Sequence, residues 1–110
     1  MGHYLLRWQF SASAAKAMVA KPQDRTRPAT ELIESFGGKM HCYYFALGDY
    51  DGMGICEFPD HTSVTAASML AASTGSFARF ETTVLLTAQE AEEAMKQANA
   101  KSGSYKAPNA

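Results

Sequence analysis

The chain has 110 residues, of which 46% are hydrophobic and 19% charged, so it can bury one apolar core and is not expected to be disordered as a whole. Ten Lys and Arg residues nearly balance eleven Asp and Glu residues, and this balance provides no broad positive surface that would favour nucleic acid or an anionic membrane as a partner. No apolar run approaches the roughly 20 residues that a membrane-spanning helix needs.

The first expected strand covers residues 3–10, where alternate side chains form an aromatic face and a more polar face. An Ala-rich segment, residues 11–20, predicts a short helix that Pro22 interrupts. A second helical stretch, residues 29–36, places Leu32, Ile33 and Phe36 at helical spacing before a pair of glycines that can end it. We therefore expect a broken helical connection after the first strand.

Two further strand-like segments, residues 39–47 and 53–58, are separated by a Gly-Asp-Tyr-Asp-Gly sequence that is typical of a hairpin turn. A helix is expected over residues 63–73, with Asp60 or Thr62 as its N-cap. The last strand is expected over residues 77–86. Thr87 and Glu90 then form the pattern of a capping box, which predicts a polar helix to about Ala100.

This order of elements predicts an α+β fold, a ferredoxin-like βαββαβ antiparallel sheet with a C-terminal helix. Right-handed connections place the first and third strands in the centre of the sheet and both helical connections on one face, which leaves the other face uncovered. We expect a single domain over residues 1–100 and a flexible tail over residues 101–110.

Several segments resemble the GYD-domain family, one branch of the dimeric α+β barrel proteins, over roughly residues 3–90. The resemblance is carried by Gly48-Asp49-Tyr50-Asp51, Glu57, Pro59-Asp60, Gly37-Gly38, the LLRW pattern of the first strand and the segment TGSFARFETTVLLT. It implies a homodimer joined sheet to sheet. It implies no particular activity, because the wider superfamily includes cofactor-independent monooxygenases, isomerases, haem-dependent enzymes and proteins without known chemistry.

The related monooxygenases hold flat hydrophobic substrates between the sheet and its helices. By this resemblance, the ligand-binding candidates here are Tyr4, Trp8 and Tyr44, with Arg25 from the polar segment before the second helix. Packing in the core is the alternative role for the three aromatic residues, since a small domain needs such rings inside. We find no cofactor motif and expect no cofactor.

The uncovered face of the sheet is expected to form the dimer interface, because the chain has helices for one side only. Its candidate residues are Leu5, Arg7, Glu57, Arg79 and Glu81. Charged residues in the middle of strands must be solvated, paired or placed in a polar site, so a substrate-binding role is the alternative.

The remaining polar residues favour structural roles. His3, His41 and His61 are dispersed, and His3 and His41 are expected on strands that are not neighbours, so we expect no metal site. Asp49 and Asp51 can bind a cation, but a Gly-flanked turn also favours Asp.

The two cysteines, Cys42 and Cys56, lie on the expected hairpin partners and come close to facing each other, which would suit a redox pair; buried packing is the alternative. No leader with an apolar core precedes the first strand, so we expect reduced thiols and a cytoplasmic protein.

Two functions remain open at this point. The first is a homo-oligomeric protein that binds a small hydrophobic or aromatic molecule between sheet and helices, with or without catalysis. The second is a non-enzymatic oligomerisation or structural module with no ligand. A cavity of at least ~300 Å³ with convergent polar groups would favour the first function, and a filled core would favour the second.

Overall fold

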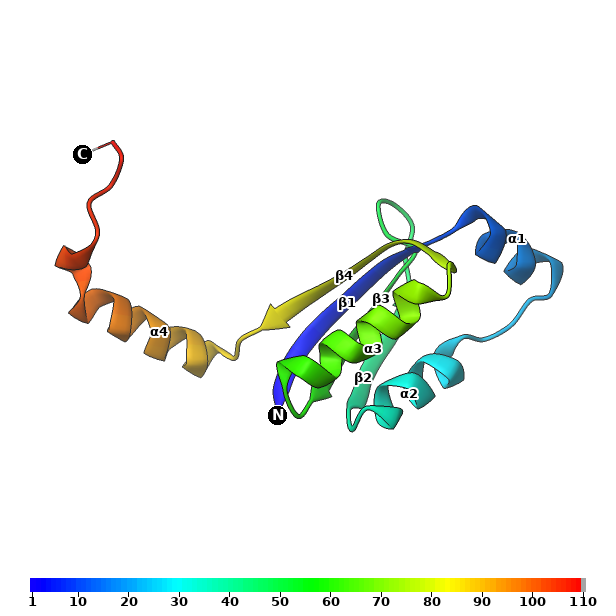
Figure 1. The fold of residues 1–110 in the computed structure, drawn as a ribbon, viewed down its shortest axis with the longest axis horizontal. Helices are drawn as coiled ribbons and strands as arrows, with labels where there is room; N and C mark the ends of the chain where they lie inside the picture. The colour runs from blue at the N-terminus through cyan, green and yellow to red at the C-terminus, as the bar shows by residue number, and fades with distance from the viewer. Residues whose placement is uncertain (110) are drawn as a thin grey trace.

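The computed structural model describes residues 1–109, in which four strands form one antiparallel sheet and helices lie over one of its faces (Figure 1). The elements in chain order are β1 (Gly2–Phe10), α1 (Ala12–Ala20), α2 (Thr26–Ser35), β2 (Lys39–Phe45), β3 (Gly52–Phe58), α3 (His61–Ser73), β4 (Phe77–Leu85), α4 (Ala88–Ala100) and a short 3₁₀ turn, η1 (Ser102–Ser104). Each strand and helix expected from the sequence is present. Within residues 1–109, no helix is both long enough and apolar enough to cross a membrane.

The strand order is β2-β3-β1-β4, with every neighbouring pair antiparallel. The expected central position of β1 and β3, with β2 and β4 at the edges, is therefore confirmed. The hairpin differs from the expectation, because β2 already ends at Phe45 and β3 begins at Gly52. The connection between them is a six-residue loop, residues 46–51, rather than a tight turn.

Side-chain caps explain where three of the helices begin. The Ser11 hydroxyl accepts a hydrogen bond from the Ala14 amide at the start of α1, and the Asp60 carboxylate accepts one from the Ser63 amide at 2.7 Å at the start of α3. Asp60, rather than Thr62, is thus the cap of α3. The capping box of α4 is confirmed, since the Thr87 and Glu90 side chains each bond to the other residue's backbone amide.

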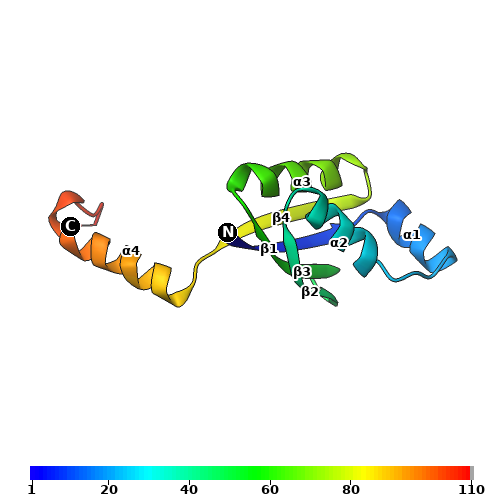
Figure 2. The same cartoon turned by 90° about the horizontal axis from the view of Figure 1, so that it is seen from below.

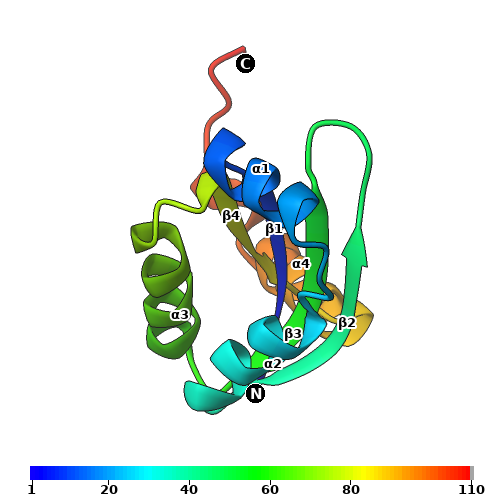
Figure 3. The same cartoon turned by 90° about the vertical axis from the view of Figure 1, so that its right-hand side faces the viewer.

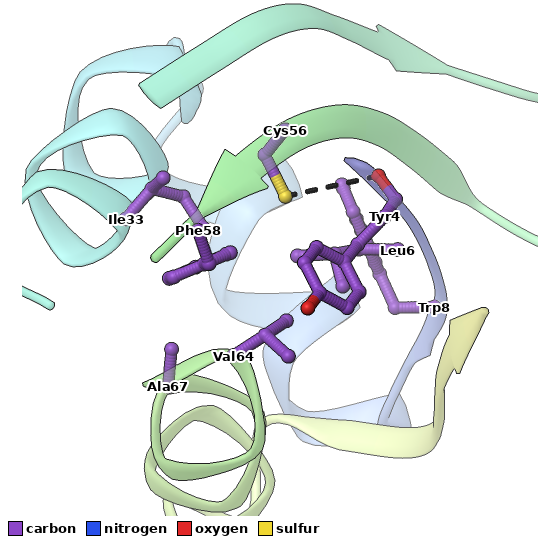
Figure 4. Close-up of a cluster of buried hydrophobic side chains, with 8 residues drawn as sticks. All are labelled: Tyr4, Leu6, Trp8, Ile33, Cys56, Phe58, Val64 and Ala67. Carbon is purple, nitrogen blue, oxygen red and sulfur yellow. Dashed lines mark hydrogen bonds between the residues drawn. The ribbon is translucent and has the colours of Figure 1, made fainter. Parts of the chain in front are cut away.

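The core lies between the sheet and α2 and α3 (Figure 4). The aromatic face of β1 contributes Tyr4, Leu6 and Trp8, all at most 5% exposed. Alternation along the strand puts all three on the helix side, as the sequence predicts. They pack with buried apolar side chains from the other elements: Ile33, Cys56, Phe58, Val64 and Ala67.

Within residues 1–109, no helix lies over the opposite face of the sheet. Helix α4, the one element that could fold back over that face, instead projects away from the sheet (Figures 1 and 2). It has no buried residue, in keeping with its polar sequence. Flexibility of the expected tail, residues 101–110, stays a prediction, and its last residue, Ala110, lies outside the described residues.

Candidate functional site

A cavity of about 590 Å³ lies between the sheet and the three helices α1, α2 and α3. Figure 3, which looks along the long axis of the molecule, shows the three helices arranged around this region. The walls are mainly apolar. The helices contribute Ala14, Ala17, Met18, Ala29, Leu32, Ile33, Leu70 and Ala71, and the strands contribute Leu6, Trp8, Phe10, Met40, Tyr43, Phe77 and Phe80.

Aromatic rings cluster around Trp8 on the sheet side of the cavity. The Trp8 ring stacks on Phe80 with an interplanar angle of 16°, and the centroid of the Tyr43 ring lies 5.3 Å from that of Trp8. Phe77 meets the Trp8 ring edge-on. Such a group of rings offers flat apolar surfaces against which a planar molecule can pack.

Two glycines of β3 allow close packing beside these rings. A Cβ atom placed on Gly52 would lie 2.6 Å from the Trp8 ring, and one placed on Gly54 would lie 3.1 Å from the Cys42 carbonyl oxygen and 3.3 Å from the Met40 sulfur. Both glycines stand opposite β1, Gly52 beside Trp8 and Gly54 beside Leu6. Sequence reasoning missed this role, although the alternation of small residues at positions 52, 54 and 56 is a readable signal.

Polar groups gather where α1 runs into α2. Arg25 and Gln23 line the cavity there, and the Arg25 guanidinium donates a hydrogen bond of 2.9 Å to the Gln23 side-chain oxygen. Arg25 is the only charged residue among the lining residues of the described chain. Burial raises the pKa of Tyr43, and the nearby Arg25 charge partly offsets that rise.

One buried donor at this wall is unsatisfied. The indole nitrogen Nε1 of Trp8 is closed off from solvent and finds no acceptor within residues 1–109. A buried N–H without an acceptor costs about 1–3 kcal/mol, so such groups are uncommon in folded proteins.

The four expected ligand-binding residues separate into two pairs. Trp8 and Arg25 line the cavity, whereas Tyr4 and Tyr44 do not. Tyr4 is buried deeper in the core, where its hydroxyl lies 2.7 Å from Nδ1 of His61. Tyr44 pairs with Met53 on the uncovered face and is 62% exposed. Its neighbour Tyr43 occupies the position that was expected for Tyr44.

An irregularity in β2 explains why Tyr43, and not Tyr44, lines the cavity. The register with β3 shifts between Met40 and Cys42, so that His41 is an extra, unpaired residue. A bulge of this kind reverses the alternation of every side chain that follows it. Tyr43 consequently faces the helices, and Tyr44 faces the open side.

The same shift separates the two cysteines. Cys56 stands opposite Met40 in the register and is fully buried on the helix side of the sheet. Cys42 stands opposite Ile55, and both of these residues lie on the face that turns away from the helices. Burial raises the pKa of the Cys56 thiol to about 12, with a smaller contribution from Cys42. Both cysteines are free, and the imagined redox pairing across the hairpin has no support in this register.

The expected interface residues all lie on the uncovered face, and the four charged ones belong to two separate clusters, whereas Leu5 belongs to neither. The first, here called the Tyr50 cluster, consists of Arg7, Tyr50, Arg79 and Glu81. Both guanidinium groups lie over the Tyr50 ring, at 4.5 Å and 4.6 Å from its centroid. The Tyr50 hydroxyl donates a 2.6 Å hydrogen bond to Glu81, which raises the pKa of Tyr50. Arg7 and Arg79 also pair with Glu81, at 3.3 Å and 3.7 Å.

The loop that carries Tyr50 is tied to the sheet by its backbone and by Asp51. The Asp51 carboxylate accepts a hydrogen bond from the Phe10 amide at 2.9 Å, and the Asp51 amide donates to the Trp8 carbonyl at 2.8 Å. The Asp49 carbonyl accepts a bond from Arg79. Asp51 therefore has a structural role, although its carboxylate bonds to β1 and not to a backbone donor of its own turn as expected.

The second cluster, here called the histidine cluster, consists of His3, His41 and Glu57. His41 Nε2 lies 2.6 Å from one Glu57 oxygen, and His3 Nε2 lies 3.7 Å from the other. The two imidazole rings stack with their centroids 5.7 Å apart. The expectation that these histidines stay apart was wrong, because both side chains lean over β3, the strand between them. The hydrogen bond from His41 is the main cause that lowers the pKa of Glu57.

Residues 4–95 match the family model of the GYD domain. No curated protein matches the chain. Since the family match covers most of the 110 residues, the chain belongs to the GYD-domain family, as the resemblance noted in its sequence implied. Membership of this family assigns no activity, so the function has to be argued from the site.

Proposed function

We propose that this protein binds a small, flat, mainly apolar molecule in the cavity between the sheet and helices α1 to α3. The observation that carries the proposal is the cavity itself: about 590 Å³ of space lined by the Trp8 ring group. Pockets for small molecules commonly measure ~300–1,000 Å³, with mostly apolar walls and a few polar groups. A domain this small has strong reason to fill such a space with its own side chains if the space serves no purpose.

The polar groups suggest the chemistry of one end of the ligand. Arg25 is a permanent cation on the cavity wall, and its guanidinium suits a carboxylate, a sulfonate or another anionic oxygen group. The proposed ligand is therefore an aromatic or otherwise planar molecule with one anionic or oxygen-bearing end.

We further propose that two chains pair through their uncovered sheet faces to give a dimeric α+β barrel built from two ferredoxin-like halves. The face mixes apolar groups, such as Leu5 and Ile55, with the charges of the Tyr50 cluster. Because the cavity lies on the opposite side of the sheet, dimerisation would leave it accessible. The free cysteines are in keeping with a cytoplasmic setting, which forms part of the same proposal.

The direct test uses 8-anilinonaphthalene-1-sulfonate, an aromatic sulfonate that fluoresces in apolar surroundings. Trp8 is the only tryptophan, so excitation of Trp8 followed by emission from the probe reports binding near this ring. We expect saturable, sensitised emission from the folded protein. Ala29→Phe fills the cavity from α2 and should lower the affinity for the probe at least tenfold. Arg25→Gln should lower the affinity by a smaller factor.

Two matched substitutions control for general effects. Ala72→Phe adds the same ring on the exposed side of α3, and Arg27→Gln removes an exposed guanidinium that pairs with Glu31 outside the cavity. Both variants should bind the probe as the unmodified chain does. Equal binding by Ala29→Phe and Ala72→Phe would show that the probe sits elsewhere, and an absence of binding would favour the ligand-free structural module.

A further inference from the structure

We propose that the histidine cluster is a binding site for a divalent transition-metal ion of the Zn²⁺ type, held by His3, His41 and Glu57. Two imidazole nitrogens and one carboxylate oxygen form a donor set that suits such ions and leaves a further coordination position open. The proposal stands on the open face of the sheet and does not depend on a ligand in the cavity.

Sheet register brings the three donors together from three strands. His3 on β1 stands directly opposite Glu57 on β3, so their side chains share the open face. His41 comes from β2 on the other side of β3, and it is the extra residue of the bulge between Met40 and Cys42. Bulges commonly re-aim a side chain at functional sites, and this one turns His41 toward Glu57 instead of leaving it in the alternating pattern.

The donor atoms are close to the spacing that a metal ion requires. All three lie within 4.8 Å of one another, with nitrogen-to-oxygen distances of 2.6 Å and 3.7 Å to Glu57. Bond lengths of about 2.0–2.2 Å in a tetrahedral site place neighbouring donors roughly 3.3–3.6 Å apart. Small side-chain rotations therefore suffice, and in the single chain the three side chains are 39%, 36% and 21% exposed, which leaves room for them.

A positive charge near the histidine cluster allows a second test, in which a substitution is expected to tighten metal binding instead of weakening it. Lys39 on β2 stands opposite Glu57 in the strand register. Its positive charge acts on Glu57 and opposes the binding of a metal ion there. It is exposed at the edge of the sheet, so its removal should leave the fold intact. If the cluster takes up a cation, Lys39→Gln should tighten the binding, whereas an ion-pair cluster with only a structural role would gain nothing from this change.

The experiment uses the full chain without an affinity tag, first cleared of metal with a chelator and then titrated with Zn²⁺ against a chromophoric competitor at pH 7.5. We expect one ion per chain with a dissociation constant below about 100 µM. His3→Ala, His41→Ala and Glu57→Gln should each weaken binding at least about tenfold, because each removes one of three protein ligands. Co²⁺ should give visible absorption bands that the same variants lose.

The control variants remove the same chemical groups elsewhere. His61→Ala removes the histidine that contacts Tyr4, and Glu81→Gln removes the carboxylate of the Tyr50 cluster on the same face. Both should bind Zn²⁺ normally, and circular dichroism should show that every variant is folded. Binding that is absent, that survives in all three cluster variants, or that is lost equally in the controls would overturn the proposal.

Discussion

The Cys56 thiol is fully buried between β3 and the helices, and its hydrogen points toward the Tyr4 carbonyl oxygen, 3.8 Å from the sulfur. Because burial raises its pKa to about 12, the reactive thiolate is scarce at any physiological pH. We predict that in a Cys42→Ser chain an aromatic disulfide reagent at pH 8 leaves Cys56 unlabelled while the protein is folded. Denaturant should then release one thiol per chain. Rapid labelling of the folded variant would contradict this placement.

The cap residue Asp60 makes the stability of the protein depend on pH through helix α3. Hydrogen bonding from Ser63, first from its backbone amide and then from its side chain, lowers the pKa of Asp60 below its ordinary value, so the folded state favours the carboxylate. A depressed pKa contributes stability that is present above the unfolded value near 4 and is lost as pH falls through the folded value. We predict that Asp60→Ala lowers the Tm at pH 7 and that the difference from the unmodified chain shrinks toward pH 2.

The comparison for Asp60 is Thr62→Ala, which changes the other cap candidate of the same helix. Thr62 lies inside α3 and does not cap it, so this variant should show no loss that depends on pH. A Tm difference for Asp60→Ala that persists unchanged at pH 2 would mean that the carboxylate charge has no part in the cap.

At the scale of the elements, the approach of β3 to β1 depends on Gly52. A methyl group there would lie 2.6 Å from ring atoms of Trp8, so either the ring or the strand must move. We predict that Gly52→Ala costs about 1–3 kcal/mol of unfolding free energy, in the range of other overpacked cores, and shifts the Trp8 emission. Gly103→Ala, which places its methyl group in open space, should change neither property. If Gly52→Ala left the unfolding free energy unchanged, Gly52 would not lie as close to the Trp8 ring as the structure places it.

Much of the fold could be predicted because each element carries its own local signal. Alternation in β1 identified the buried side of Tyr4, Leu6 and Trp8, and the Thr87 and Glu90 pair marked the start of α4. The central placement of β1 and β3 followed from connection handedness alone.

The parts of the site that could not be predicted trace to one residue. The bulge at His41 carries no sequence signal comparable to a turn glycine, because it depends on how β2 pairs with β3. Strict alternation from Met40 would put Tyr44 beside the helices and Cys42 near Cys56. The inserted residue exchanges Tyr44 for Tyr43 at the cavity, separates the cysteines and brings His41 to Glu57.

For the whole molecule, the uncovered sheet face sets the expected association. Leu5 lies near the middle of that face, between Ile55 on β3 and Thr83 on β4. We predict that sedimentation equilibrium at micromolar concentration gives a dimer and that Leu5→Glu dissociates it, because a buried unpaired charge is costly in an interface. Val19→Glu, on the exposed side of α1, should leave the dimer intact. A mass near 11.9 kDa for the unmodified chain would reject the dimer.

The most direct test of the ligand cavity is native mass spectrometry of the protein purified from its own host. We predict a species at twice the 11.9 kDa chain mass in which each chain carries a small organic molecule that is released on denaturation. Ala29→Phe, purified in the same way, should give the dimer without the adduct, while Ala72→Phe should retain it. Chains that carry no small molecule, or an adduct that Ala29→Phe retains in full, would contradict the account.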